Sequence, residues 1–251
     1  MSKDLAVKEN TALSTEVLDF SADASQGLEN VDKDSLAIPF LQVLQPLSPQ
    51  IETVEGAKAG KLINTITNEL MDEAFVVPVA FQRRFIRWAL RENGGGYRGE
   101  MTAAEVEALN LKRDDQGRLM YEGDELKDTR NHFVLIVSKD QTKFQPALFS
   151  LGSTQIKKSK RWLSRIQGIQ LQDANGKIFT PPSFSHVYSV KTLKESNDKG
   201  FWYGIDVDIL GPVTSRAIYE AAKAFHGQIV SGQVNVQPPV DDADSSDSDK
   251  F

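Results

Sequence analysis

The segment from Phe81 to Gly99, FQRRFIRWALRENGGGYRG, mixes positive charge with aromatic rings. Guanidinium groups bind phosphates, and aromatic rings stack on unpaired bases at about 1–3 kcal/mol per base. This combination predicts contact with a single-stranded nucleic acid. The candidate residues are the arginines Arg83, Arg84, Arg87, Arg91 and Arg98 and the aromatic residues Phe81, Phe85, Trp88 and Tyr97.

A strand is expected to position these side chains. Residues 75–90 are rich in β-branched and aromatic residues, and Pro78 among them predicts a sheet edge or a bulge. Alternation along a strand places Phe81, Arg83, Phe85, Arg87 and Arg91 on one face. The alternative is a strand with its aromatic side chains in the core and its arginines in solvent. The shared face argues against this alternative, although a bulge or the twist of the sheet would permit it.

A second basic element is predicted over residues 153–168, the clearest helical pattern in the chain. Lys157, Arg161 and Arg165 follow one another at four-residue spacing, with Lys158 and Lys160 beside them. Like charges at this spacing repel, and a phosphate backbone would relieve the repulsion. The alternative is the solvated face of an ordinary surface helix. Trp162 next to the stripe belongs either to the core or to a base-stacking surface.

Motifs for enzyme chemistry are scarce. The chain has no cysteine, its three histidines show no metal-ligand spacing, and Gly60-Lys61 lacks the rest of a phosphate-binding loop. Asp206 and Asp208 share a strand face and would suit Mg²⁺ in a nuclease or recombination enzyme, but such a pair is more often the wet side of a strand. We therefore predict no catalytic residue, no metal and no cofactor, with a metal-dependent nuclease as the alternative.

Charge is distributed unevenly along the chain. Residues 1–34 hold eight acids and three bases, residues 241–251 five acids and one base, and the segment between them 22 acids and 25 bases. A weakly basic body thus lies between two acidic ends, an asymmetry typical of nucleic-acid partners. An acidic tail can mimic nucleic acid and dock on partner proteins through its last residue. The predicted docking residues are Asp241, Asp242, Asp244, Asp247, Asp249 and Phe251.

The element pattern predicts one α+β domain over residues 35–230. Neighbouring strands are expected to form hairpins, which gives a mainly antiparallel curved sheet or an OB-like partly open barrel with two or three helices. Thr102 and Glu105 stand at capping-box spacing and predict a short helix over residues 102–109. Residues 110–130 are charged and are expected to form a loop, or a loop with a hairpin around Asp115–Gly117. The acidic ends, residues 1–34 and 231–251, are expected to be disordered. No signal peptide or membrane span is recognised, which predicts a cytoplasmic protein.

An acidic tail ending in phenylalanine, after a basic OB-like body without catalytic motifs, resembles the phage-encoded single-stranded DNA-binding proteins. The stretches IPFLQVLQPLSPQ and AGKLINTIT...FVVPVAFQRRFIRW are also similar to a phage family of such proteins. The resemblance implies sequence-tolerant coating of single strands, self-association on DNA, and a tail that contacts replication proteins. Some phage members also act as cofactors of RNA polymerase, and an interaction module of that kind is a further alternative. Lys250 and the serines of the tail depart from the pattern.

Overall fold

The computed structural model describes residues 26–29, 37–198 and 200–234. The chain divides into two compact units, residues 1–36 and residues 37–251. In the first unit the backbone amide of Gly27 donates to the Glu29 carboxylate over 2.9 Å. The predictions for the two acidic ends lie almost entirely outside the described residues.

In chain order, the second unit contains these helices and strands: β1 Leu41–Val43, α1 Gln50–Thr53, β2 Leu62–Asn64, β3 Leu70–Met71, β4 Glu73–Ala89, η2 Arg91–Asn93, β5 Tyr97–Thr102, α2 Ala103–Ala108, β6 Leu119–Tyr121, β7 Asp124–Val137, β8 Phe144–Gly152, η3 Ser153–Gln155, α3 Ile156–Gln167, β9 Leu171–Gln172, β10 Ile178–Phe179, η4 Ser183–Ser185, β11 His186–Asn197, β12 Gly200–Pro212 and α4 Arg216–Val230.

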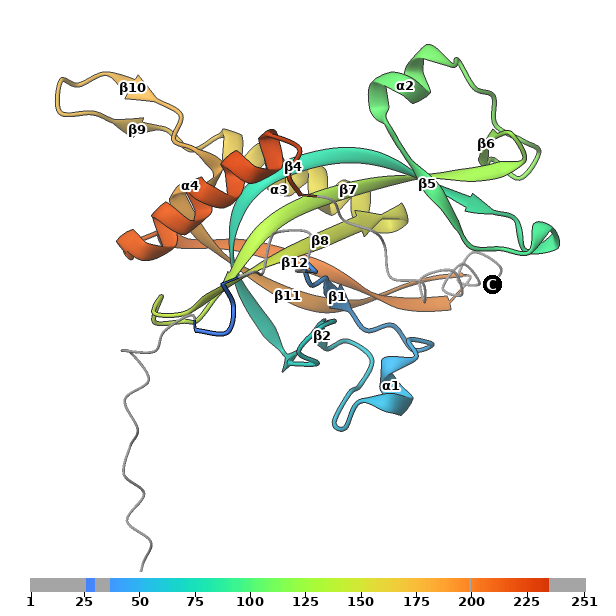
Figure 1. Ribbon diagram of the computed structural model, residues 1–251, viewed down its shortest axis with the longest axis horizontal. Helices are drawn as coiled ribbons and strands as arrows, with labels where there is room; N and C mark the ends of the chain where they lie inside the picture. Colours follow the sequence, from blue (N-terminus) through green and yellow to red (C-terminus); the bar gives the residue numbers. More distant parts are fainter. Residues whose placement is uncertain (1–25, 30–36, 199, 235–251) are drawn as a thin grey trace, which may run out of the picture. The chain divides into compact units, whose positions relative to one another are not determined.

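A seven-stranded sheet forms the body of the unit, and β4 and β7 run side by side through its middle (Figure 1). Beyond this pair the order continues through β11 to β12 on one side, while β8 and β6 pair with different parts of β7 and β5 pairs with the end of β4. Every one of these strand pairs is antiparallel. The predicted α+β class with a mainly antiparallel, partly open sheet is confirmed, and the sheet does not close into a barrel.

Two helices cover the two faces of this sheet. Helix α4 buries the apolar stripe Ile218, Ala222, Phe225 and Ile229 against Val77, Val79, Phe133 and Leu135. On the other face α3 inserts Trp162 among Val76, Phe149, Tyr188 and Ile205. Alternation along β4 and β7 sends successive side chains to these two cores, because neighbouring strand residues point to opposite faces.

The structure confirms two local predictions and corrects a third. The register between β4 and β7 shifts between Pro78 and Ala80, which is the bulge that Pro78 predicted. Thr102 caps α2 in a capping box with Glu105. The prediction of a loop over residues 110–130 is wrong for the second half of this segment, because β6 and the first residues of β7 lie there. Asp124 and Asp128 of β7 bind Arg87 and Arg83 of β4, a strand that is distant in sequence.

Two of the outer strands of the curved sheet, β8 and β12, form hydrogen bonds with segments outside the sheet. The chain just before β1 reaches β8, where the Leu148 amide donates to the Pro39 carbonyl over 2.8 Å. Gln45, just after β1, reaches β12: its amide donates to the Tyr203 carbonyl at 2.8 Å and accepts from the Tyr203 amide at 2.9 Å. The Gln155 side chain accepts from the Ile205 amide at 3.1 Å, and Arg165 donates to the Val207 carbonyl. Side chains thus satisfy the outer backbone groups of β12.

Two smaller parts complete the unit. Strands β1, β2 and β3 form a small antiparallel sheet, and β9 with β10 forms a hairpin that projects from the body (Figure 1). Neither β5 nor the β9–β10 hairpin was predicted. Among the described residues no helix is long and apolar enough to cross a membrane.

Candidate nucleic-acid interface

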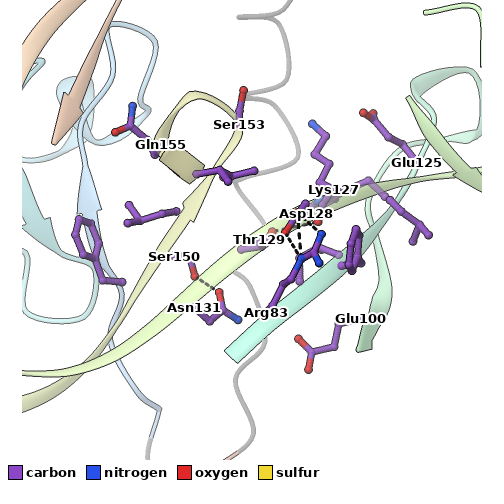
Figure 2. A pocket seen from close by; sticks show the side chains of 18 of the residues that line it. Arg83, Glu100, Glu125, Lys127, Asp128, Thr129, Asn131, Ser150, Ser153 and Gln155 are labelled. Atoms are coloured by element: carbon purple, nitrogen blue, oxygen red, sulfur yellow. Dashed lines mark hydrogen bonds and ion pairs between the residues drawn. The ribbon is translucent and has the colours of Figure 1, made fainter. Parts of the chain in front are cut away.

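An open groove of about 810 Å³ lies where the ends of β4, β7 and β8 approach β1 and the start of α3. Figure 2 shows its polar lining, which includes Arg83 of β4, Lys127 and Asn131 of β7, and Ser150 of β8. Ser150 donates to the Asn131 side chain at 2.8 Å. Ser153 and Gln155 line the groove immediately before α3 begins, so the groove leads to the start of that helix.

Arg83 is held by an acid of its own chain. Its Nη2 lies 2.8 Å from Oδ2 of Asp128, as Figure 2 shows, and its guanidinium carbon lies 4.8 Å from the centre of the Phe85 ring. Arg130, opposite Arg83 on β7, reaches the same Asp128 oxygen at 3.2 Å. The hydrogen bonds that Arg83 donates to Asp128 raise the pKa of Arg83 above its already high ordinary value.

Arg84 and Arg87 are likewise paired. Arg84 lies 3.1 Å from the Glu100 carboxylate on β5. Arg87 binds Asp124 at 2.7 Å and Glu122 at 3.2 Å, and the hydrogen bond that Arg87 donates to Asp124 raises the pKa of Arg87. Sequence reasoning missed these acids, because Glu100 and Asp124 lie on strands, and Glu122 on the turn before β7, that meet β4 only after folding. Most of the positive charge predicted on β4 is therefore balanced within the protein.

The aromatic residues of this segment occupy different environments. Phe85 is 6% exposed and packs with Val106 and Leu126, so its ring is closed to solvent. Trp88 and Tyr97 are half-buried and meet edge to face with their ring centres 6.0 Å apart. The structure thus combines the two alternatives: Arg83, Phe85 and Arg87 share a face of β4, as expected, yet Phe85 also belongs to a hydrophobic cluster. The expected place of Arg91 on this face is wrong, because β4 ends at Ala89 and Arg91 begins η2.

Phe81 leads instead into a buried column of rings. Its centre lies 5.1 Å from that of His132, which stacks on Trp162 at 4.5 Å. His132 lies within hydrogen-bond distance of Ser159, at 2.7 Å, and burial lowers its pKa to about 3, so the ring is neutral at physiological pH. Trp162 is 1% exposed, which places it in the core rather than on a stacking surface.

Helix α3 presents the cations that remain unpaired. It carries five basic residues and no acid. Two of these are bound: Lys158 to Glu195 at 2.6 Å and Arg165 to Asp208 at 3.2 Å. Within the described part of the chain, the exposed side chains of Lys157, Lys160 and Arg161 form no ion pair. These three residues, called the α3 cations below, form a group of free positive charge on the helix whose first residue, Ile156, lines the groove.

The structure brings only part of the predicted site together. Arg83, Phe85 and Trp88 line the groove, whereas Arg84, Arg87, Tyr97 and the exposed Arg91 and Arg98 lie outside its lining. Lys127 lines the groove and forms no ion pair among the residues described, but it was missed because it falls in the segment expected to be a loop. Asp241, Asp242, Asp244, Asp247, Asp249 and Phe251 lie outside the described residues.

The two aspartates considered for metal chemistry have cations beside them. Asp206 lies opposite Lys191 in the β11–β12 pair, and Asp208 is bound by Arg165. Across the described ranges no group of three or more histidine, aspartate or glutamate side chains is arranged to hold a metal ion.

Comparison with known proteins gives one match. No curated protein and no solved structure is significantly similar to the chain. The family model described as Pam3 phage gp34-like protein matches residues 7–235, which is most of the sequence. The match supports the expected phage character and leaves single-stranded DNA binding a prediction. The chain belongs to the Pam3 phage gp34-like protein family.

Proposed function

We propose that this protein binds single-stranded DNA without catalysing a reaction on it. The observation that carries the proposal is the group of unpaired α3 cations, on a helix whose first residue, Ile156, lines an open groove. Nucleic-acid backbones bind to lysine and arginine side chains chiefly by releasing counterions, which requires positive charge that is not already neutralised. On α3 the chain supplies such charge on an element without any acid.

The groove suits a flexible single strand. Its lining mixes an arginine–aspartate pair, amide and hydroxyl groups, and aromatic side chains, and Lys127 adds a further free cation. Because the acids on β5 and β7 balance Arg83, Arg84 and Arg87, we expect phosphate contacts to depend on α3 and Lys127. Stacking and backbone contacts read little sequence, so the binding should be sequence-tolerant.

The family and the charge pattern support a biological setting for this proposal. We propose that the protein acts in the cytoplasm of the infected cell, in replication, recombination or transcription, and its membership in a phage family supports this setting. Its acidic tail, ending in Phe251, would recruit a replication protein or an RNA polymerase, and several copies would associate along one strand. The arrangement of Asp206 and Asp208 gives no support to the nuclease alternative.

Titration of a labelled oligo(dT) of about 20 nucleotides tests the proposal. We expect saturable binding that weakens steeply as salt rises, and weaker binding to a duplex of equal length. Absence of binding at low salt would overturn it, and equal affinity for duplex would make the protein a general DNA-binding protein. Incubation of both DNAs with Mg²⁺ belongs to the same series, since cleavage would contradict a purely binding role.

The role of the tail has a separate test. Deletion of Phe251 should leave the affinity for oligo(dT) nearly unchanged and remove binding to a purified polymerase or helicase of the infected cell. If the deletion weakens DNA binding instead, the tail is part of the DNA site.

A further inference from the structure

A phenylalanine with a cation over its ring stands on the β11–β12 hairpin. Phe201 is 49% exposed, and the Nζ atom of Lys194 lies 4.0 Å from the centre of its ring. Tyr203 meets Phe201 at 6.4 Å with the two ring planes at 81°. None of these three residues belongs to the arginine–aromatic segment of β4.

The hairpin is continuous with the groove. Tyr203 lines the groove, and Phe201 is two residues away on the same strand, so the two rings share a face of the sheet. Lys194 lies opposite Tyr203 in the β11–β12 pair and belongs to that face as well. A single-stranded nucleic acid that leaves the groove past Tyr203 would therefore meet Phe201 and Lys194 next.

The position of this face is fixed by the surrounding contacts. The Tyr203 ring packs on Gly60, where a Cβ atom would lie 2.5 Å from Cε1 of the tyrosine. Gln45 holds the backbone of Tyr203 through two hydrogen bonds. Glu195 on the same hairpin binds Lys158 of α3 at 2.6 Å and accepts from Trp202 at 3.0 Å. The hairpin is thus attached both to the β1–β3 sheet and to the helix with the free cations.

We infer that Phe201 is a base-stacking subsite at the exit of the groove, with Lys194 beside it for the adjoining phosphate. The inference rests on the proposed function and names where an unpaired base is bound. A half-exposed ring offers one free face for stacking, and an ammonium group near it binds the phosphate that every stacked nucleotide carries. Phe85, by contrast, has no free face.

Two probes distinguish binding through the Phe201 ring from binding through the Lys194 charge. They are oligo(dT) of about 20 nucleotides and an abasic sugar-phosphate strand of the same length. Phe201→Ala should weaken oligo(dT) binding by about 5- to 100-fold and leave abasic-strand binding unchanged, since only a base can stack. Phe201→Trp should restore the affinity. Lys194→Gln should weaken both strands, because the phosphate is common to them.

Phe144→Ala is the matched control, because Phe144 is also exposed, at 43%, but does not line the groove. It should change neither affinity, and thermal unfolding should show that all variants are folded. The subsite is wrong if the parent protein binds oligo(dT) and Phe201→Ala binds it equally well, or if Phe201→Ala weakens both strands alike. If the parent binds neither strand, the proposed function itself fails.

Discussion

Arg83 and Arg130 lie directly opposite each other on β4 and β7, and a single carboxylate, that of Asp128, binds both guanidinium groups. Like charges in this position of an antiparallel pair destabilise the sheet unless a counter-charge lies between them. Asp128 supplies that charge, and Glu107 lies 3.9 Å from Arg83 as a second acid.

The first prediction concerns this carboxylate. Asp128→Asn should lower the free energy of unfolding by about 1–3 kcal/mol, because two partly buried arginines lose a charge-assisted partner. Urea unfolding measures the change. Asp115→Asn, which removes an acid from an exposed loop, is the control and should have almost no effect. An unchanged midpoint for Asp128→Asn would show that the two arginines do not need the carboxylate.

The second prediction concerns the α3 cations. Replacing Lys157, Lys160 and Arg161 together with glutamine should reduce the slope of log affinity against log salt by about 2, since each phosphate contact to a single strand contributes about 0.7. The matched control replaces three exposed lysines elsewhere, Lys112, Lys177 and Lys223, with the same change of net charge. If both triple variants lose the same slope, net charge rather than α3 determines binding.

A third prediction concerns the contact between Gly60 and Tyr203. Gly60 has a φ of +91°, and an added Cβ would meet the tyrosine ring, so Gly60→Ala should destabilise the protein by at least about 2 kcal/mol. Gly56→Ala is the control, because Gly56 has a φ of +78° but a Cβ atom added there would lie 3.8 Å from its nearest neighbour, a Cδ1 atom of Leu70. It carries the backbone strain without the steric clash. Equal losses of stability in the two variants would mean that the clash is relieved at no cost.

A fourth prediction follows from the buried His132. Its pKa is about 3 in the folded protein against about 6.5 when unfolded, so the unfolded state binds more protons between these values. Stability should therefore be complete above about pH 6.5 and fall as the pH drops below it, by up to about 1.4 kcal/mol per pH unit. Burial lowers the pKa of His186 as well, which adds to the same trend.

Urea unfolding at about pH 7, 6 and 5 tests this dependence above the range in which most carboxylates titrate. His132→Asn should be less stable than the parent at neutral pH, yet lose less stability on acidification. If the variant and the parent show parallel pH profiles, another group titrates in this range.

Local sequence patterns predicted the elements whose partners are near in sequence or whose burial is one-sided. The β-branched run before Arg83, the bulge at Pro78 and the capping box of Thr102 and Glu105 are all visible in the sequence, and each is present. The segment DELKDTR was expected to be a loop because its charges give no apolar face. It forms a strand because its acids pair with the arginines of β4.

The candidate site was less predictable for the same reason. The spacing of Arg83, Arg84 and Arg87 shows where positive charge gathers but not that Asp128, Glu100 and Asp124 balance it. The α3 cations were recognisable from an acid-free helix. The pairing of Lys194 with Phe201 had one visible signal, the aromatic run FWY after a polar turn, whereas the groove beside it depends on the folded positions of β1 and β12.

Gln45, Gln155 and Arg165 together occupy the outer backbone groups of β12 at Tyr203, Ile205 and Val207. An unpaired strand edge of this length is a template on which another chain can add a strand and begin to aggregate. The three protecting side chains come from segments that precede β12 in the sequence, so during synthesis they are available before the edge exists. A chain that begins after Gln45 would leave the backbone groups of Tyr203 without these hydrogen bonds. We expect such a chain to form insoluble polymer rather than to lose affinity for DNA.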